Sequence, residues 1–160
     1  MDPITALAAD IASRAHAGQY DKAGQPYIEH VRRVATYVNP TDPHAVATAW
    51  LHDTLEDSPI TAAELAAEGI PTQVIEAVEL LTRSHDQPST TYYARIRAHP
   101  LARQVKLADL ADNSDPHRLA QLPEPQRAKL HTKYTHAYHA LDADPQDGHH
   151  RRSHRHSVPS

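Results

Sequence analysis

Cysteine and phenylalanine are absent from this 160-residue sequence, and tryptophan occurs once. Without cysteine the chain forms no disulfide, no thiolate metal site and no cysteine nucleophile. Any metal site must therefore use His, Asp, Glu, Asn or backbone oxygen. These ligands suit Mn²⁺, Mg²⁺, Fe²⁺ or Zn²⁺ at a hydrolytic centre rather than a structural zinc. Because aromatic residues are few and alanine is common, the composition favours a tightly packed helical protein.

A long apolar run is also absent, since a membrane-spanning helix needs about 18 consecutive apolar residues. The first residues, Met-Asp-Pro-Ile-Thr, lack the basic region and apolar core of a signal peptide, so we expect a cytoplasmic protein. The formal charge of −4 is mild, whereas proteins dedicated to nucleic acids or anionic membranes are normally basic. We therefore expect neither nucleic acid nor a membrane as a partner.

Apolar residues recur at helical spacing through most of the chain. Asp2-Pro3 starts a first helix, which Gly18 ends. A second helix is predicted from about residue 27 to 38, and a third from 44 to 57 with Asp42 as its N-cap. A capping box over residues 61–64 opens a short fourth helix. Further helices are predicted at residues 71–82, 91–98, 101–112 and 125–141.

No segment shows a convincing strand pattern or an internal repeat. We therefore predict an all-α bundle of about seven to nine helices over residues 1–141. Residues 142–160 are rich in His, Arg, Asp, Ser and Pro and have no apolar face to bury, which predicts a disordered tail. The tail histidines are interpreted as part of a flexible extension, although they could bind transition metals. They are His149, His150, His154 and His156.

The most informative stretch is Ala49–Asp57, which places His52, Asp53, Glu56 and Asp57 on an otherwise apolar helix. Ionised carboxylates are costly to bury without a partner, so this stretch indicates a cation or a water-filled cleft nearby. Residues four apart share a helix face, but adjacent residues are rotated by about 100°. His52 and Asp53 therefore reach one ion only if other helices complete its shell.

Two residues are placed to complete such a shell. His30 lies on the second predicted helix and Asp109 on a late one, each in an apolar setting. Together with His52 and Asp53 they supply two imidazoles and two carboxylates. This shell leaves positions open for water and substrate, as in a divalent ion that acts as a Lewis acid and activates water.

The order His, then His-Asp, then Asp resembles the HD-domain phosphohydrolase superfamily. The surrounding sequence is similar to the hydrolase domain of RelA/SpoT-type proteins and their small stand-alone relatives, such as the metazoan SpoT homologue. Among the matching patterns are HDxxED and KLADxxxN, and the resemblance extends over roughly residues 5 to 122. The matching blocks are residues 16–19, 22–30, 49–57 and 105–113.

The resemblance implies an HD-domain helical bundle with one Mn²⁺ ion; Mg²⁺, Fe²⁺ and Zn²⁺ are alternatives. It also implies that Glu56 orients or deprotonates the attacking water, and that Asp57 supports it or handles the leaving group. Lys22 and Asn113 would contact substrate. The implied ligands are His30, His52, Asp53 and Asp109.

The implied reaction is removal of the 3′-pyrophosphate from guanosine tetra- or pentaphosphate, (p)ppGpp. Some small relatives act on other phosphorylated nucleotides. A phosphomonoesterase acting on a nucleoside monophosphate or a phosphorylated dinucleotide of the NADPH type is therefore an alternative. A non-catalytic binding protein of the same fold is a second alternative, but such a protein should have lost Glu56, Asp57 or a metal ligand.

Several residues allow two interpretations. Asp21 stands where the family often has arginine, so we expect it to repel an anionic substrate or to fail to stack a base. Asp112 is interpreted as a surface charge rather than a partner of a metal ligand, and Tyr27 as a core residue. Lys106 could bind phosphate or only pack through its stem. His16 is expected to brace the following loop through a hydrogen bond.

Overall fold

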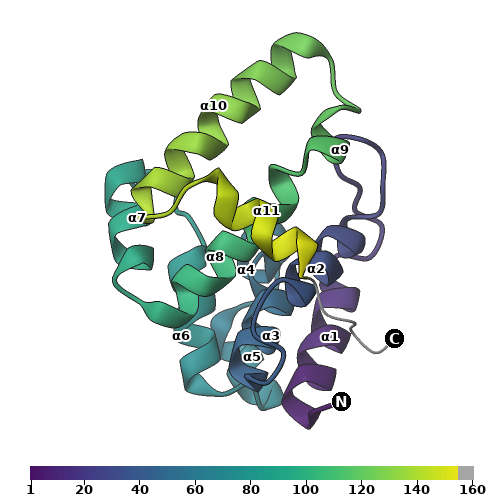
Figure 1. Cartoon of the computed structure of the whole chain (residues 1–160). Coiled ribbons are helices and arrows are strands. Elements are labelled where there is room, and N and C mark those ends of the chain that lie inside the picture. Colours follow the sequence, from purple (N-terminus) through teal and green to yellow (C-terminus); the bar gives the residue numbers. More distant parts are fainter. Residues whose placement is uncertain (155–160) are drawn as a thin grey trace.

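Helices form all the regular elements of residues 1–154, which are the residues that the computed structural model describes (Figure 1). None of these helices combines the length and the apolar character required to cross a membrane. The prediction of an all-α fold is confirmed. The helices are α1 (Pro3–Ala15), α2 (Tyr27–Thr36), α3 (Pro43–Leu51), α4 (Thr54–Asp57), α5 (Ala62–Glu68), α6 (Thr72–Leu81), α7 (Ser89–Arg97), α8 (Pro100–Asn113), α9 (Pro116–Leu119), α10 (Glu124–Ala140) and α11 (Pro145–Ser153).

Helix α3 forms the centre of the bundle and packs against α1, α2, α6 and α8. Its residues 45–51 are all buried, and Ala45, Ala47 and Ala49 are fully inaccessible. Small side chains allow helix axes to approach closely. The alanine-rich sequence thus builds the tight core that its composition predicts, and α3 carries the His-Asp pair at its carboxyl end.

The helix predicted from residue 44 to 57 is interrupted at its most informative point. Helix α3 ends at Leu51 and α4 begins at Thr54, because Asp53 adopts φ −105° and ψ 1°. An unbroken helix would rotate consecutive side chains apart by about 100°. Because the helix is interrupted here, the side chains of His52 and Asp53 can face the same point.

Residues 145–153 correct the prediction of a disordered tail that begins at residue 142. They form α11, with Asp144 as its N-cap and Pro145 in its first turn. Arg151 Nη1 donates to the Tyr37 carbonyl at 2.9 Å, and Arg152 Nη1 donates to the Ala111 carbonyl at 2.6 Å. Arginine hydrogen bonds, rather than apolar side chains, attach α11 to the bundle. Residues 155–160, including His156, lie outside the described part of the chain.

Gly148 provides the close contact between α11 and α10. A Cβ atom there would overlap the Tyr138 hydroxyl oxygen and lie 3.1 Å from Tyr138 Cζ. The Tyr138 ring is buried and its hydroxyl lies 3.0 Å from Ser114 Oγ, so it has little room to move.

We expect Gly148→Ala to destabilise the protein by about 1–3 kcal/mol, the usual cost of overpacking. Thermal unfolding followed by circular dichroism measures the change, with the exposed Ser153→Ala as control. An unchanged melting temperature in Gly148→Ala would show that α11 does not dock in this way.

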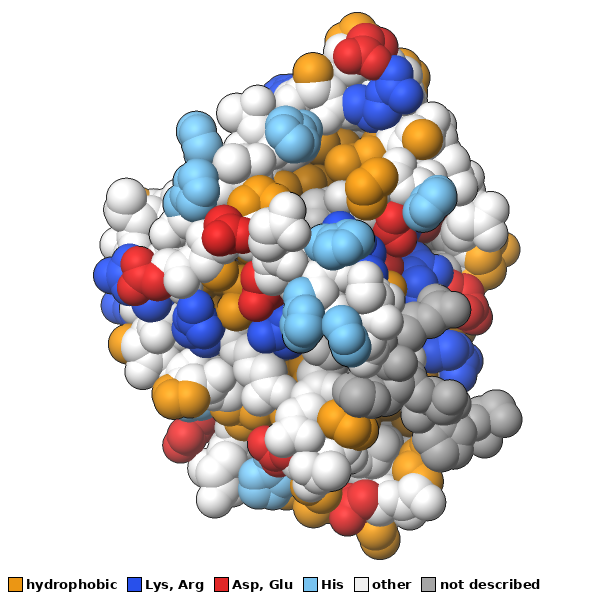
Figure 2. Space-filling view, viewed as in Figure 1, with side chains coloured by type: hydrophobic (Ala, Val, Ile, Leu, Met, Phe, Trp, Pro, Cys, Tyr) orange, Lys and Arg blue, Asp and Glu red, His pale blue; other side chains and the backbone are white. Residues whose placement is uncertain are grey.

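Helix α10 arches over one end of the bundle, where it packs against α7 and α8 (Figure 1). The space-filling view shows apolar side chains in a hollow beneath this arch and histidines on the surface around it (Figure 2). Besides α11, two short helices were not expected from the sequence, the single turns α4 and α9.

Candidate metal centre and adjoining cleft

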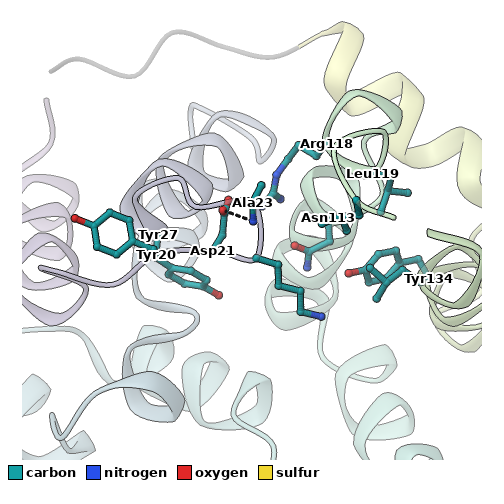
Figure 3. Close-up of a pocket in the computed structure, with 11 residues that line it drawn as sticks. Tyr20, Asp21, Ala23, Tyr27, Asn113, Arg118, Leu119 and Tyr134 are labelled. Carbon is teal, nitrogen blue, oxygen red and sulfur yellow. Dashed lines mark hydrogen bonds and ion pairs between the residues drawn. The ribbon is translucent and has the colours of Figure 1, made fainter. Parts of the chain in front are cut away.

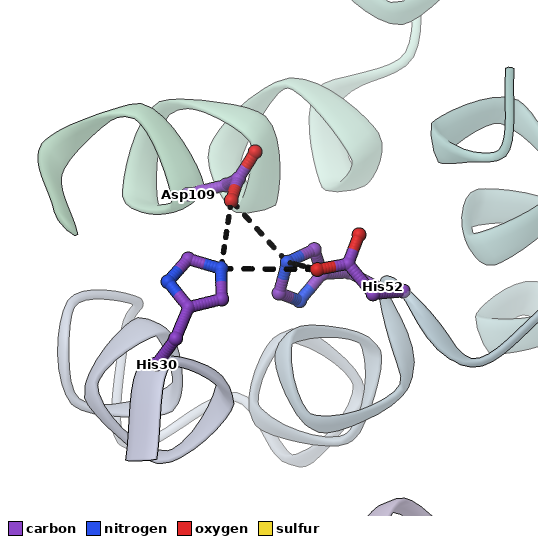
Figure 4. A group of neighbouring side chains, drawn as sticks. His30, His52 and Asp109 are labelled. Carbon is purple, nitrogen blue, oxygen red and sulfur yellow. Dashed lines mark ion pairs between the residues drawn. The ribbon is translucent and has the colours of Figure 1, made fainter. Parts of the chain in front are cut away.

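The four predicted ligands converge from α2, the α3–α4 turn and α8 (Figure 4). One nitrogen or oxygen from each of His30, His52, Asp53 and Asp109 lies within 4.8 Å of the other three. His52 Nε2 lies 2.9 Å from Asp53 Oδ2 and 3.3 Å from Asp109 Oδ1. His30 Nε2 lies 3.1 Å from the same Asp109 oxygen. Residues 79 positions apart in the sequence thus form one compact group.

Hydrogen bonds fix which ring nitrogen of each histidine faces the group. His30 Nδ1 lies 2.6 Å from Asp112 Oδ2, and His52 Nδ1 lies 2.7 Å from the Ala49 carbonyl oxygen. A carbonyl only accepts, so His52 Nδ1 carries the proton and its Nε2 holds a lone pair. That buried Nε2 has no hydrogen-bond partner. A lone pair that faces two carboxylates is repelled by them unless a proton or a metal ion lies between, so this donor set fits a divalent ion.

The charges of the group lead to the same conclusion. Burial lowers the pKa of His52, but the Asp53 and Asp109 carboxylates outweigh burial and raise this pKa well above its usual value. Burial raises the pKa of Asp109, but Lys106 and the two imidazoles outweigh it and hold the pKa well below the usual range. The cluster therefore demands positive charge from protons or a metal ion, and metal binding should release protons.

Asp112 corrects the interpretation as a surface charge. Its side chain is fully buried, and it accepts from His30 Nδ1, from Arg33 Nε at 2.6 Å and from Arg118 Nη1 at 2.7 Å. The carboxylate fixes the orientation of the His30 ring, and the two guanidinium groups neutralise its charge. Carboxylate–histidine pairs of this kind orient metal-ligating imidazoles and raise their basicity.

We expect Asp112→Asn to weaken Mn²⁺ binding by about 10–100-fold, the usual effect of removing such a partner. The amide keeps the size of the side chain but accepts a weaker hydrogen bond from His30. Calorimetric titration with Mn²⁺ measures the affinity, with Asp10→Asn on the exposed face of α1 as control. Equal affinities in both variants would contradict the orienting role.

Three further side chains hold the carboxylate ligands. The Tyr27 hydroxyl donates to Asp53 Oδ2 at 2.6 Å, so this residue does more than fill the core. Lys106 Nζ donates to Asp109 Oδ2 at 2.9 Å, and Asn113 Nδ2 donates to Asp109 Oδ1 at 3.0 Å. The ammonium group of Lys106 is thus already paired with the carboxylate of Asp109.

Glu56 and Asp57 lie on α4, at the exposed side of the cluster. Glu56 Oε1 accepts the backbone N–H of Arg83 at 2.8 Å. Gln19 Nε2 donates to the Asp57 carbonyl at 2.8 Å, and His16 Nδ1 lies 2.8 Å from Gln19 Oε1. The predicted bracing role of His16 is confirmed, and the brace extends to α4.

Burial and the negative charges of Asp53 and Glu56 raise the pKa of Asp57 from 3.8 to about 6. Folding therefore favours the uncharged carboxyl group of Asp57 over its carboxylate. The stability that this uncharged group contributes to the folded protein is present below pH 3.8 and is lost as the pH rises through about 6.

In the metal-free protein, we expect the NMR chemical shift of the Asp57 carboxyl carbon to change with pH around a midpoint of about 6, the pKa of this group. Added Zn²⁺ should lower that midpoint because it offsets the charge of Asp53. Asp57→Asn identifies the resonance by removing it. A metal-free midpoint at the ordinary aspartate value would show that Asp57 does not lie against the cluster.

A cavity of about 270 Å³ adjoins the centre between the loop after α1, the end of α8 and the arch of α10 (Figure 3). Lys22, Asn113 and Tyr134 line it. The Asp21 carboxylate accepts two backbone N–H groups of its own loop and pairs with Arg118 Nη2 at 3.0 Å. The expected repulsion is therefore reduced, since Arg118 offsets the charge of Asp21.

Sequence reasoning missed Lys133, because α10 reads as a surface helix. Partial burial lowers the pKa of Lys133, and the like charges of Lys22, Lys106 and Arg83 lower it further. A second cavity of about 520 Å³ is lined by Arg83, Arg97 and Lys133 and by no acidic residue. Asp142 Oδ2 lies 3.9 Å from Arg97 Nε, whereas Arg83 and Lys133 form no ion pair among the described contacts. Their unpaired charges favour an anionic ligand.

A family model described as HD domain matches residues 8–143 of the chain. Two curated relatives carry the name guanosine-3′,5′-bis(diphosphate) 3′-pyrophosphohydrolase. The protein from Haemophilus influenzae is 43% identical over 60 residues, which cover 36% of this chain and 9% of that protein. The protein from Borreliella burgdorferi is 31% identical over 86 residues, covering 52% of this chain and 13% of that protein. The chain thus matches a minor part of either relative's length.

A solved structure described as "A metazoan ortholog of SpoT hydrolyzes ppGpp and plays a role in starvation responses" has the same fold. The TM-score is 0.75 at 19% sequence identity, and the superposition covers 96% of this chain and 93% of that chain. At this identity the likeness concerns the arrangement of the helices.

Proposed function

The chain belongs to the HD domain family, and on that premise we propose that it is a divalent-metal-dependent hydrolase of pyrophosphorylated or phosphorylated nucleotides. The preferred reaction is removal of the 3′-pyrophosphate from a (p)ppGpp-like substrate. The names of the two curated relatives support this choice of substrate.

One observation carries the proposal. Two imidazole Nε2 atoms and two carboxylate oxygens lie together, with the opposite nitrogen of each ring held by an acceptor. The proposed ligands of Mn²⁺ are His30, His52, Asp53 and Asp109. Mg²⁺, Fe²⁺ and Zn²⁺ are also compatible with this donor set.

A bound Mn²⁺ supplies a Lewis acid that acidifies water and polarises a phosphoryl oxygen. Glu56 orients the attacking water and takes its proton while the new oxygen–phosphorus bond forms. The bond between phosphorus and the 3′ oxygen breaks, and Asp57 supports Glu56 or delivers a proton to that oxygen. Such positioned acids and bases contribute about 10²–10⁴-fold to a rate.

The cations around the cleft are assigned to the substrate. Lys22 and Asn113 line the smaller cavity, and Lys133 lines the larger one. The charges of Lys22 and Lys133 are close enough to interact, and this positive charge favours a substrate with more than one phosphate group over a nucleoside monophosphate. The presence of Glu56, Asp57 and the complete ligand set argues against a non-catalytic binding protein.

The test is to incubate the full chain with Mn²⁺ and guanosine 3′,5′-bis(diphosphate) and to identify the products by mass spectrometry. Release of pyrophosphate supports the proposal. Release of orthophosphate from a nucleoside monophosphate or a phosphorylated dinucleotide would assign the phosphomonoesterase alternative. No turnover of any nucleotide in a panel, with metal bound, would reject an enzymatic role.

A further inference from the structure

Helix α11 carries a pair of histidines that the proposed reaction does not use. His150 and His154 are four residues apart on α11 and at its C-cap, and their ring centroids are 4.3 Å apart with an interplanar angle of 34°. Both side chains are exposed. Figure 2 shows several histidine side chains on this face of the molecule.

The geometry leaves ligand atoms available on both rings. His154 Nδ1 lies 2.9 Å from the His150 carbonyl oxygen, so Nδ1 donates and the lone pair resides on Nε2. The described contacts include no ion pair or side-chain hydrogen bond that occupies the His150 ring. Two histidines at positions i and i+4 share a helix face, and this spacing binds zinc in helical metal sites.

The helix is fixed in place, so the two rings do not have to be ordered by the ion. Arg151 and Arg152 attach α11 to the Tyr37 and Ala111 carbonyls. Arg151 Nε also pairs with Asp147 Oδ2 at 2.8 Å, so the charges of that pair offset each other. The carboxyl end of a helix carries partial negative charge, which favours a cation there.

We propose that His150 and His154 form a second, surface binding site for a divalent transition-metal ion such as Ni²⁺, Cu²⁺ or Zn²⁺. Two imidazoles supply the protein ligands, and water completes the coordination shell. Imidazole nitrogen suits these ions, whereas Mg²⁺ and Mn²⁺ prefer oxygen-rich sites. The site therefore discriminates against Mg²⁺ and Mn²⁺, and it is independent of the proposed reaction.

The test uses the full chain and Ni²⁺ alone, with amide hydrogen exchange measured over residues 145–154 and binding stoichiometry measured by calorimetry. An ion that joins His150 to His154 stabilises the end of α11 against opening. At free Ni²⁺ about 100 times Kd, mass action slows exchange through that opening by up to about a hundredfold. The wild type should also bind one more Ni²⁺ than His154→Ala.

Two variants and one matched control make the result specific. His154→Ala and His150→Ala should each abolish the slowed exchange and the additional bound ion. His149→Ala, the neighbouring exposed histidine on another face of α11, should retain both. Equal behaviour of His149→Ala and His154→Ala, or exchange in the wild type that Ni²⁺ leaves unchanged, overturns the proposal. Neither result depends on whether the chain hydrolyses a nucleotide.

Discussion

An Asp53→Ala variant is expected to fold, to bind no Mn²⁺ at the candidate centre and to lose nucleotide hydrolysis. Asp53 Oδ2 lies 2.9 Å from His52 Nε2 and 3.7 Å from His30 Nε2, so its removal takes one of two carboxylate ligands from the cluster. The metal ion supplies several kcal/mol of transition-state stabilisation. A loss of about 4 kcal/mol corresponds to a rate reduced by about a thousandfold.

Folding should survive because Asp53 lies in the turn between α3 and α4 and its side chain is not part of the apolar core. Calorimetry with Mn²⁺, circular dichroism and turnover are measured together, with the exposed loop variant Asp86→Ala as control. Undiminished metal binding or activity in Asp53→Ala would contradict the ligand assignment.

A Glu56→Gln variant is expected to keep its metal affinity and lose about 10²–10⁴-fold in kcat, the usual contribution of a general base. Its amide oxygen can still accept the backbone N–H of Arg83, which Glu56 Oε1 accepts at 2.8 Å. The side chain therefore stays in place while its ability to take a proton is lost.

Glu76→Gln, on the face of α6 away from the core, is a matched control because it makes the same chemical change at an exposed site. Comparison of kcat with Mn²⁺ affinity separates a proton-transfer role from metal binding. If Glu56→Gln lost metal and activity in parallel, the residue would belong to the metal site instead.

The ends of several helices could be predicted because their signals are local. Asp2 and Asp42 cap α1 and α3 before a proline, and the Thr61–Glu64 capping box opens α5. Each depends on atoms two or three residues apart. The interruption at residues 52–53 could not be predicted in the same way, because apolar periodicity continues across it. The interruption depends on the directions in which the side chains of His52 and Asp53 point in the folded protein.

The surroundings of the cluster depend on contacts between distant segments. Asp112 meets His30 across 82 positions, and Asp21 meets Arg118 across 97. A charged residue near a helix end reads as solvated when its partners are unknown, which explains the wrong interpretation of Asp112. The interpretation of Tyr27 as a core residue is incomplete, because its ring packs against the core while its hydroxyl reaches Asp53.

Helix α11 shows the limit of reasoning from hydropathy. Its sequence has no apolar face, and composition alone predicts disorder. It docks instead through Gly148, which allows close approach to Tyr138, and through two arginines that donate to backbone carbonyls. These contacts depend on where α8 and α10 place their acceptors and ring.

The most direct test of the metal centre is a crystal structure of the chain soaked with Mn²⁺, with anomalous differences recorded at the manganese edge. We predict one strong peak per chain, at coordination distance from His30 Nε2, His52 Nε2 and an oxygen of each of Asp53 and Asp109. A map with no peak between these four side chains, at Mn²⁺ concentrations that support turnover, would contradict the account.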